Sequence, residues 1–304
     1  MKKIKSIVTG GAGFIGSNLV DRLVKEGHKI IVLDNFVSGK RSNLSHHLKK
    51  DVEIINLDIS NTKKFDKYFK DVSYVFHLAG LAEIVPSIKN PKKYFINNVL
   101  GTLNVLEAAK KVKVKKFIYA SSSSVYGGNK ILPFSVKQRV DSPVSIYAAS
   151  KKSGELISES YAHLFGIQCI GLRFFTVYGP WGRPDMATFI FTKRIIEGKE
   201  IEVFNKGKMK RDFTFIDDIV EGILGCCEKP AFPEEKIENI DCDPSISSAP
   251  YRIFNIGNNK PVELNYFIEL LEEYLPVKSY KVDHAIVTPY HVGKNISKNV
   301  FWNF

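Results

Sequence analysis

Short runs of β-branched and other apolar residues alternate with longer amphipathic stretches through the first half of the chain. Apolar runs without strict alternation are typical of strands buried on both faces of a sheet. Because helical patterns separate these runs, we expect a parallel, doubly wound sheet with right-handed crossovers. The expected strands are 4–10, 29–35, 52–58, 74–80 and 116–122, and the expected helices are 14–26, 62–70, 97–112 and 147–165.

The pattern changes near residue 170. A strand over 169–179 leads into a Pro- and Gly-rich loop at 179–185, and a helix over 187–197 and short strands follow. Residues 229–250 are rich in Pro, Ser and acidic side chains, which favours a loop. We therefore expect a doubly wound α/β domain over 1–170 and a smaller mixed α/β substrate-binding lobe over 171–304, with a soft boundary.

Composition and charge place the chain among ordinary globular proteins. It has 304 residues, 44% hydrophobic and 25% charged. No uncharged apolar run approaches roughly 18 residues, and the N-terminus lacks the apolar segment of a signal peptide. We therefore expect a cytoplasmic protein without membrane insertion. The net charge of +12 comes from scattered lysines without a nucleic-acid-binding motif, so we expect a solvated basic surface and no nucleic-acid partner.

The cysteines and histidines give no metal pattern. Cys226 and Cys227 are adjacent, whereas zinc ligand pairs are usually separated by intervening residues. We expect the cysteines to be small buried hydrophobic residues, and we expect no metal. His284 and His291 have no acidic partners in a ligand pattern and are expected at the surface.

A glycine-rich turn follows the first expected strand and opens the first helix. Gly10, Gly13 and Gly16 allow a tight turn, close approach of a pyrophosphate and close helix–sheet packing. The helix N-terminus attracts phosphate groups. Asp34 ends the second strand, where a carboxylate can accept from both ribose hydroxyls and would repel a 2′-phosphate. The pattern predicts a Rossmann-type fold that binds NAD rather than NADP.

The ends of the third and fourth strands are also expected to contact the cofactor. Asp58 ends the third strand and would hydrogen-bond adenine, although such a residue is also commonly a strand-end cap. Leu78, Ala79 and Gly80 end the fourth strand with small residues, as expected where a strand end faces a cofactor in the crevice.

Tyr147 and Lys151 lie four residues apart, which places them on one face of a helix. A tyrosine normally has a pKa of about 10, and a nearby lysine and a positively charged nicotinamide both favour the phenolate. A serine at the end of the preceding strand, within 121–124, can hydrogen-bond a reacting hydroxyl. A Tyr-x-x-x-Lys string also arises by chance, and a serine run is commonly a polar loop. The position downstream of the glycine turn favours a catalytic set.

Together, GGAGFIG, LDN, LAG, SSSSVYG and YAASK resemble the extended short-chain dehydrogenase/reductases that act on nucleotide sugars. LRFFTVYGPWGRPDMATFIFTKRI, KMKRDFTFIDDIV and YRIFNIGN are most similar to the bacterial UDP-glucuronate 4-epimerases. The resemblance covers residues 1–275. It implies a tightly held NAD, a UDP-sugar substrate and a homodimer formed through 97–112 and 147–165.

The resemblance also implies roles for single residues. Tyr147 would be the base, Lys151 would hold the nicotinamide ribose, and Ser122 would assist at the sugar O4. The implied cofactor residues are Gly10, Gly13, Phe14, Ile15, Gly16, Asp34, Asn35, Ser38, Gly39, Asp58, Ile59, Leu78, Ala79, Gly80, Asn98, Tyr147, Lys151 and Phe174. The implied substrate residues are Ser122, Ser123, Ser124, Tyr147, Thr176 and Arg183 at the sugar and its carboxylate, and Arg211 at the diphosphate. For Arg183 the alternative is a solvent-exposed loop residue, and for Arg211 a surface ion pair.

The family oxidises the sugar at C4, and the 4-keto sugar can then be epimerised, dehydrated, decarboxylated or reduced. Related dehydratases carry an Asp-Glu pair before Val-Tyr-Gly, and decarboxylases carry a Glu. Here Ser123 and Ser124 stand at these positions, which favours epimerisation. We expect conversion of UDP-glucuronate to UDP-galacturonate. The alternatives are a UDP-glucose or UDP-N-acetylglucosamine 4-epimerase, and a degenerate NAD-binding protein without activity.

Two segments depart from the uronate pattern. The loop over 35–44 is short, and it and residues 77–91 look like epimerases of neutral sugars. The segment 278–304 lacks the family's Pro-Gly-Asp stretch and final helix, and it ends in an aromatic tail containing Phe301, Trp302 and Phe304. This atypical end is the basis for the inactive alternative.

Overall fold

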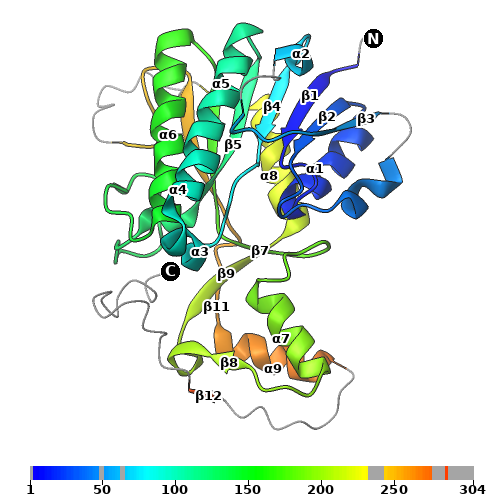
Figure 1. The fold of residues 1–304 in the computed structure, drawn as a ribbon. Helices are drawn as coiled ribbons and strands as arrows, with labels where there is room; N and C mark the ends of the chain where they lie inside the picture. Colours follow the sequence, from blue (N-terminus) through cyan, green and yellow to red (C-terminus); the bar gives the residue numbers. More distant parts are fainter. Residues whose placement is uncertain (1–2, 48–50, 62–65, 232–242, 276–284, 287–304) are drawn as a thin grey trace.

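The computed structural model describes residues 3–47, 51–61, 66–231, 243–275 and 285–286. These residues form a large sheet covered by helices on both faces and a smaller lobe beneath it (Figure 1). The expectations for His284, His291, Cys242 and the aromatic tail lie outside the described residues.

Seven parallel strands form the large sheet in the order β10-β6-β5-β4-β1-β2-β3. The doubly wound, Rossmann-type sheet expected from the sequence is therefore confirmed. The strand order reverses between β1 and β4, and ligands bind at such a reversal, beyond the carboxyl ends of the strands. The bounds are β1 Lys5–Thr9, β2 Lys29–Asp34, β3 Val52–Asn56, β4 Tyr74–His77, β5 Lys116–Ser122, β6 Cys169–Phe174 and β10 Tyr251–Ile256.

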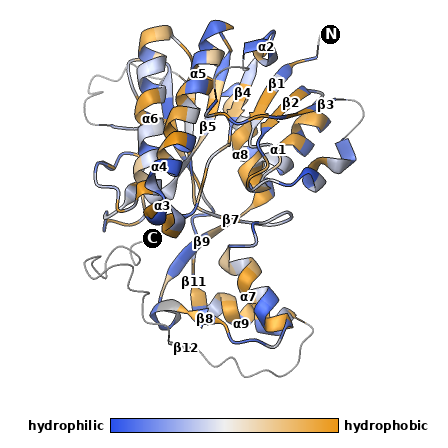
Figure 2. Cartoon of the chain, viewed as in Figure 1, coloured by the Kyte–Doolittle hydropathy of each residue, from blue (hydrophilic) through white to orange (hydrophobic). Residues whose placement is uncertain are grey.

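Helices pack on both faces of this sheet. The apolar faces of α5 and α6 bury one side, and those of α1 and α8 bury the other. Figure 2 shows hydrophobic residues along the central strands β1 and β2, as expected for strands that solvent reaches on neither face. The bounds are α1 Phe14–Lys25, α2 Asp66–Phe69, α3 Ile84–Lys89, α4 Pro91–Tyr94, α5 Gly101–Lys111, α6 Ile146–Phe165 and α8 Ile216–Glu228. Short irregular helices are η1 Arg41–His47, η3 Phe95–Leu100, η4 Ser123–Tyr126 and η5 Phe204–Gly207.

The strand expected over 169–179 is in fact two strands. Phe175 separates β6, in the large sheet, from β7 (Thr176–Tyr178), in the small one. A continuous apolar run does not reveal that the chain passes between sheets, because both strands are buried. Helix α8 and strand β10 then return to the large sheet, so this sheet is not built from residues 1–170 alone.

The smaller lobe contains a three-stranded sheet in the order β11-β9-β7, with β9 at Lys210–Phe215 and β11 at Pro261–Glu263. Helices α7 (Ala187–Ile196) and α9 (Leu264–Tyr274) pack together through buried apolar residues. Strand β8 (Glu202–Val203) pairs in parallel with β12 (Ala285–Ile286). Because β6 of the large sheet leads through Phe175 into β7, the smaller lobe lies next to the carboxyl ends of the large-sheet strands.

The helix expected at 97–112 begins earlier, with a π-helical turn at Phe95–Leu100 that continues into α5. Cys169 and Cys226 are buried free thiols, and no disulfide occurs among the described cysteines. Within the described ranges, no helix is both long and apolar enough to cross a bilayer.

Candidate active site

A cleft of about 2530 Å³ lies at the carboxyl ends of the large-sheet strands and extends to the smaller lobe. Typical pockets for one small ligand are roughly 300–1,000 Å³, so the cleft has room for a dinucleotide and a second ligand. All the site residues expected from the sequence line this cleft except Gly39 and Asn98.

The glycine turn at one end of the cleft has no room for side chains. Gly10 has a φ of +70°, and a Cβ there would lie 2.7 Å from the Ala79 backbone. A Cβ on Gly16 would lie 2.2 Å from the Gly10 carbonyl oxygen. Gly13 precedes α1 and offers no side-chain cap, so N–H groups of the first turn are available to an anion. The turn fits a dinucleotide pyrophosphate.

Two carboxylates lie farther along the same edge. Asp34 accepts N–H groups of Ala12 (2.9 Å) and Phe36 (2.8 Å), and burial raises its pKa while these bonds lower it in part. Its place at the end of β2 fits an adenosine ribose. Asp58 accepts from Asn35 (3.2 Å) and from the N–H (2.8 Å) and hydroxyl (2.7 Å) of Ser60. It therefore caps its strand end, and its adenine contact stays a prediction.

Asn98 and Gly39 support the cleft from behind. The Asn98 side chain accepts from Leu81 N (2.8 Å) and donates to Leu81 O (2.9 Å) and Ser150 Oγ (2.9 Å). It therefore ties the loop after β4 to α6, and its cofactor contact stays a prediction. A Cβ on Gly39 would lie 2.8 Å from the Ala12 carbonyl carbon, so this glycine lets its loop pack on the glycine turn.

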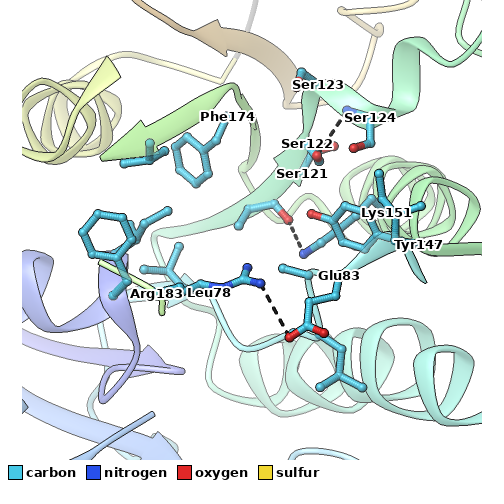
Figure 3. A pocket seen from close by; sticks show the side chains of 18 of the residues that line it. Leu78, Glu83, Ser121, Ser122, Ser123, Ser124, Tyr147, Lys151, Phe174 and Arg183 are labelled. Carbon is cyan, nitrogen blue, oxygen red and sulfur yellow. Dashed lines mark hydrogen bonds and ion pairs between the residues drawn. The ribbon is translucent and has the colours of Figure 1, made fainter. Parts of the chain in front are cut away.

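Tyr147 and Lys151 lie one turn apart on α6, whose start is fixed by the Ser145 side chain accepting a first-turn N–H at 3.0 Å. The Tyr147 side chain is buried, and its hydroxyl hydrogen-bonds Ser122. The Lys151 ammonium donates to the Ala120 carbonyl at 2.9 Å (Figure 3). The expected serine, tyrosine and lysine are thus brought together at the end of β5.

Burial raises the pKa of Tyr147, and the Ser122 hydrogen bond and the Arg183 charge act in the opposite direction. The sequence had assigned this lowering to Lys151, whose amine is directed at a backbone carbonyl instead. Burial also lowers the pKa of Lys151 to about 8. Ser122 and Arg183 therefore offset part of the effect of burial, and a further positive charge at the cleft would favour ionisation of the phenol.

The four serines at the end of β5 make different contacts. Ser121 donates to buried Glu155 at 2.6 Å. Ser122 accepts the Ser124 N–H at 3.1 Å, which starts the short helix that holds Ser123 and Ser124 at the cleft wall. All four serines line the cleft, and Ser121 also reaches the buried Glu155.

The other end of the cleft carries two arginines. Arg183 hydrogen-bonds Asp185 through Nε (3.0 Å) and Nη2, and its Nη2 lies 3.7 Å from Glu83 Oε1 (Figure 3). Its side chain is 29% exposed, so this loop residue is half-buried. Arg211, on β9, donates only a long hydrogen bond (3.4 Å) to the Lys210 carbonyl, and no carboxylate in the described part of the chain pairs with it. Its charge is available to an anion.

Several cleft residues were missed because no helix or strand was predicted between the strand at 74–80 and the helix at 97–112. This segment contains α3 and α4, and the Asn90 side chain caps α4 by accepting the Lys93 N–H, with Pro91 at the first helical position. Asn-Pro before a polar stretch is a helix-start signal that could have shown this. The missed residues are Glu83 and the cationic Lys89, Lys92 and Lys93.

One group of metal-ligating side chains lies together in the described residues, away from the cleft. The Nε2 atoms of His46 and His47 lie 2.9 and 2.6 Å from Asp21 Oδ1. These distances are those of hydrogen bonds, which join η1 to α1.

Comparisons with known proteins agree with this geometry. Protein CapI of Staphylococcus aureus is 45% identical over 285 residues, which cover 91% of this chain and 85% of that protein. UDP-glucuronate 4-epimerase 1 of Arabidopsis thaliana is 41% identical over 287 residues, covering 91% and 66%.

Solved structures are also similar. The UDP-glucuronic acid 4-epimerase of Bacillus cereus, in complex with UDP-glucuronic acid and NAD, has a TM-score of 0.77 and 34% identity, covering 89% of this chain and 82% of that one. The UDP-glucose 4-epimerase of Thermotoga maritima has a TM-score of 0.77 and 33% identity with the same coverage. The model of the NAD dependent epimerase/dehydratase family matches residues 6–257. The resemblance seen in the motifs is confirmed: the chain is an NAD-dependent enzyme of the NAD dependent epimerase/dehydratase family.

Proposed function

We propose that the chain inverts C4 of a UDP-sugar, and that it converts UDP-glucuronate to UDP-galacturonate. The observation that carries the reaction is the hydrogen bond between Tyr147 and Ser122 in a cleft that ends at the glycine turn. The 41% identity to a UDP-glucuronate 4-epimerase supports the substrate.

The glycine turn and Asp34 would hold NAD, which when bound would supply reversible hydride exchange at C4 of the sugar. Tyr147 takes the proton from the sugar O4, and Ser122 holds that oxygen through its hydroxyl. After the 4-keto sugar has turned its other face, Tyr147 gives the proton back. Ser123 and Ser124 offer no carboxylate for eliminating water, which favours epimerisation.

The two arginines would hold the rest of the substrate. We propose Arg211 for the diphosphate, because its guanidinium has no acidic partner among the described residues. Thr176 and Arg183 would hold the uronate carboxylate, which is the group that a 4-keto uronate readily loses as CO₂. The smaller lobe would thus bind the nucleotide sugar and the large sheet NAD.

Arg183→Ala is expected to raise KM for UDP-glucuronate about tenfold or more and to change KM for UDP-glucose much less. The reason is that only the uronate carries a carboxylate at C6. Steady-state kinetics with both substrates measure the two values. Equal losses would remove the carboxylate assignment.

A specific observation favours a second candidate, a neutral UDP-hexose or UDP-N-acetylhexosamine. Arg183 already contacts Asp185 and Glu83, so its charge is partly compensated without a ligand. To separate the candidates, purified protein is incubated with UDP-glucuronate, UDP-glucose and UDP-N-acetylglucosamine, and C4 inversion is followed by NMR. We expect UDP-glucuronate to be converted fastest. Inversion of none would contradict the epimerase proposal.

The pH profile of kcat/KM is expected to fall above about pH 8. Burial lowers the pKa of Lys151 to about 8, so its charge is lost as the pH rises through this value. A Lys151→Arg variant keeps its charge, and its slower reaction should lack the fall. If both enzymes show the same fall, another group is responsible.

We propose that the chain forms a homodimer through η3, α5 and α6. Large apolar side chains are exposed on two of these elements, at Phe95 and Leu100 on η3 and at Leu156, Leu164 and Phe165 on α6. Burying these apolar side chains against a second copy of the chain would be favourable. Sedimentation should show a dimer, and Leu156→Lys should weaken it. A monomer at micromolar concentration would contradict the proposal.

A further inference from the structure

The cleft wall at Arg183 holds two carboxylates against one guanidinium. Asp185 contacts Nε and Nη2 of Arg183, and Glu83 approaches the same Nη2 at 3.7 Å. Figure 3 shows Glu83 reaching toward Arg183 from the loop after β4, on the side of the cleft that also holds Tyr147. The three groups together carry one net negative charge.

The two carboxylates are not held equally. Asp185 is two residues from Arg183 on one loop and forms hydrogen bonds with two of its nitrogens. Glu83 lies beyond hydrogen-bond distance and comes from a different segment. Its side chain is 45% exposed, so water or a ligand can reach it. Glu83 is the partner that an incoming anion would displace.

The Glu83 side chain has no structural task in its own loop. It precedes α3 without forming a side-chain cap. The loop is instead held through the Glu83 backbone, which hydrogen-bonds the Tyr94 hydroxyl. Replacing the carboxylate by an amide would therefore leave the loop in place and change only the charge facing Arg183.

We propose that Glu83 is a specificity-determining residue: it competes with a sugar carboxylate for Arg183, and so lowers the preference of the site for uronates over neutral sugars. The inference rests on the proposed function, because it requires the sugar C6 to lie at Arg183. A C6 hydroxymethyl group does not displace Glu83. A C6 carboxylate must either displace it or lie next to a like charge, which is unfavourable in a partly desolvated cleft.

The test compares wild type with Glu83→Gln, and uses Glu53→Gln as a matched control, because Glu53 is exposed on β3 and does not line the cleft. Kinetics are measured with UDP-glucuronate and UDP-glucose. We expect Glu83→Gln to raise the ratio of kcat/KM for the uronate over the neutral sugar about tenfold, mainly through KM. The control should leave the ratio unchanged. A ratio within twofold of wild type in Glu83→Gln would overturn the proposal.

A double variant tests the route through Arg183. In an Arg183→Ala background, Glu83→Gln should change the ratio less than twofold, since nothing remains to compete for. An undiminished effect would mean direct repulsion and would overturn the competition. If wild type converts neither sugar, the epimerase proposal fails separately. The proposal for Glu83 is then tested by calorimetric Kd values for the two UDP-sugars. Tighter binding of UDP-glucuronate in Glu83→Gln supports the proposed competition for Arg183, and unchanged binding overturns it.

Discussion

Tyr147→Phe is expected to lower kcat for UDP-sugar epimerisation by about a thousandfold, within the range for loss of an acid–base group. The phenyl ring preserves the packing of a side chain that is only 7% exposed. What disappears is the hydroxyl that hydrogen-bonds Ser122. The neighbouring Lys151 amine, directed at the Ala120 carbonyl, is not placed to replace it. KM should change little, because the substrate contacts elsewhere remain.

The measurement is steady-state turnover of the NMR-identified substrate. Tyr178→Phe serves as the control, because Tyr178 is 40% exposed on β7 and does not line the cleft. It should retain wild-type kcat. A decrease of less than tenfold in Tyr147→Phe would show that another group takes the proton.

Glu155→Ala is expected to destabilise the protein by about 3–5 kcal/mol, the range for removing one partner of a buried ion pair. Glu155 accepts from Arg173 through Nε (2.8 Å) and Nη2 (3.0 Å), and from Ser121 at 2.6 Å. The side chains of Arg173 and Glu155 are 0% and 1% exposed. Without Glu155 the guanidinium stays buried with only a neutral partner, the Tyr126 hydroxyl at 3.1 Å.

Urea unfolding measures this loss, and Glu159→Ala, one turn along the same helix and partly exposed, is the comparison. It should change the free energy of unfolding by less than about 1 kcal/mol. Burial raises the pKa of Glu155, but the bonds and charge of Arg173 outweigh it and lower the pKa overall. The contribution of the pair is therefore present at neutral pH and lost in acid. A loss below about 1 kcal/mol in Glu155→Ala would contradict this assignment.

The same ion pair has a consequence for the site. Glu155 lies on the helix face that carries Tyr147 and Lys151, and Arg173 lies on β6. Together with Ser121 they fasten α6 to the strands whose ends form the cleft. Stability and the placement of the reactive hydroxyl thus depend on one buried contact.

The features that the sequence predicted well are local. The glycine turn is set by backbone conformation and close approach, and the spacing of Tyr147 and Lys151 is a property of any helix. The strands β1, β2, β4 and β5 were visible because most of their residues are buried on both faces of the sheet. Such features need no knowledge of distant partners.

The features that it missed depend on partners far along the chain. Phe175 divides one apolar run between two sheets, and this division depends on strands β9 and β10. The hydrogen bonds of the Asn98 amide with Leu81 and Ser150 were likewise not predicted, because these residues come from two other segments. The proposed role of Glu83 depends on its approach to Arg183, which is a hundred positions away in the sequence. The hydrophobic periodicity of the sequence does not indicate which distant residues pair in this way.

The central claim is that one hydrogen nucleus leaves C4 of the sugar and returns to the same carbon on its other face, while Tyr147 handles only the proton on O4. It is tested most directly with UDP-glucuronate deuterated at C4, converted in ordinary water and read by NMR and mass spectrometry. We predict UDP-galacturonate that keeps its deuterium at C4. Product in which C4 carries hydrogen from the solvent would contradict the account.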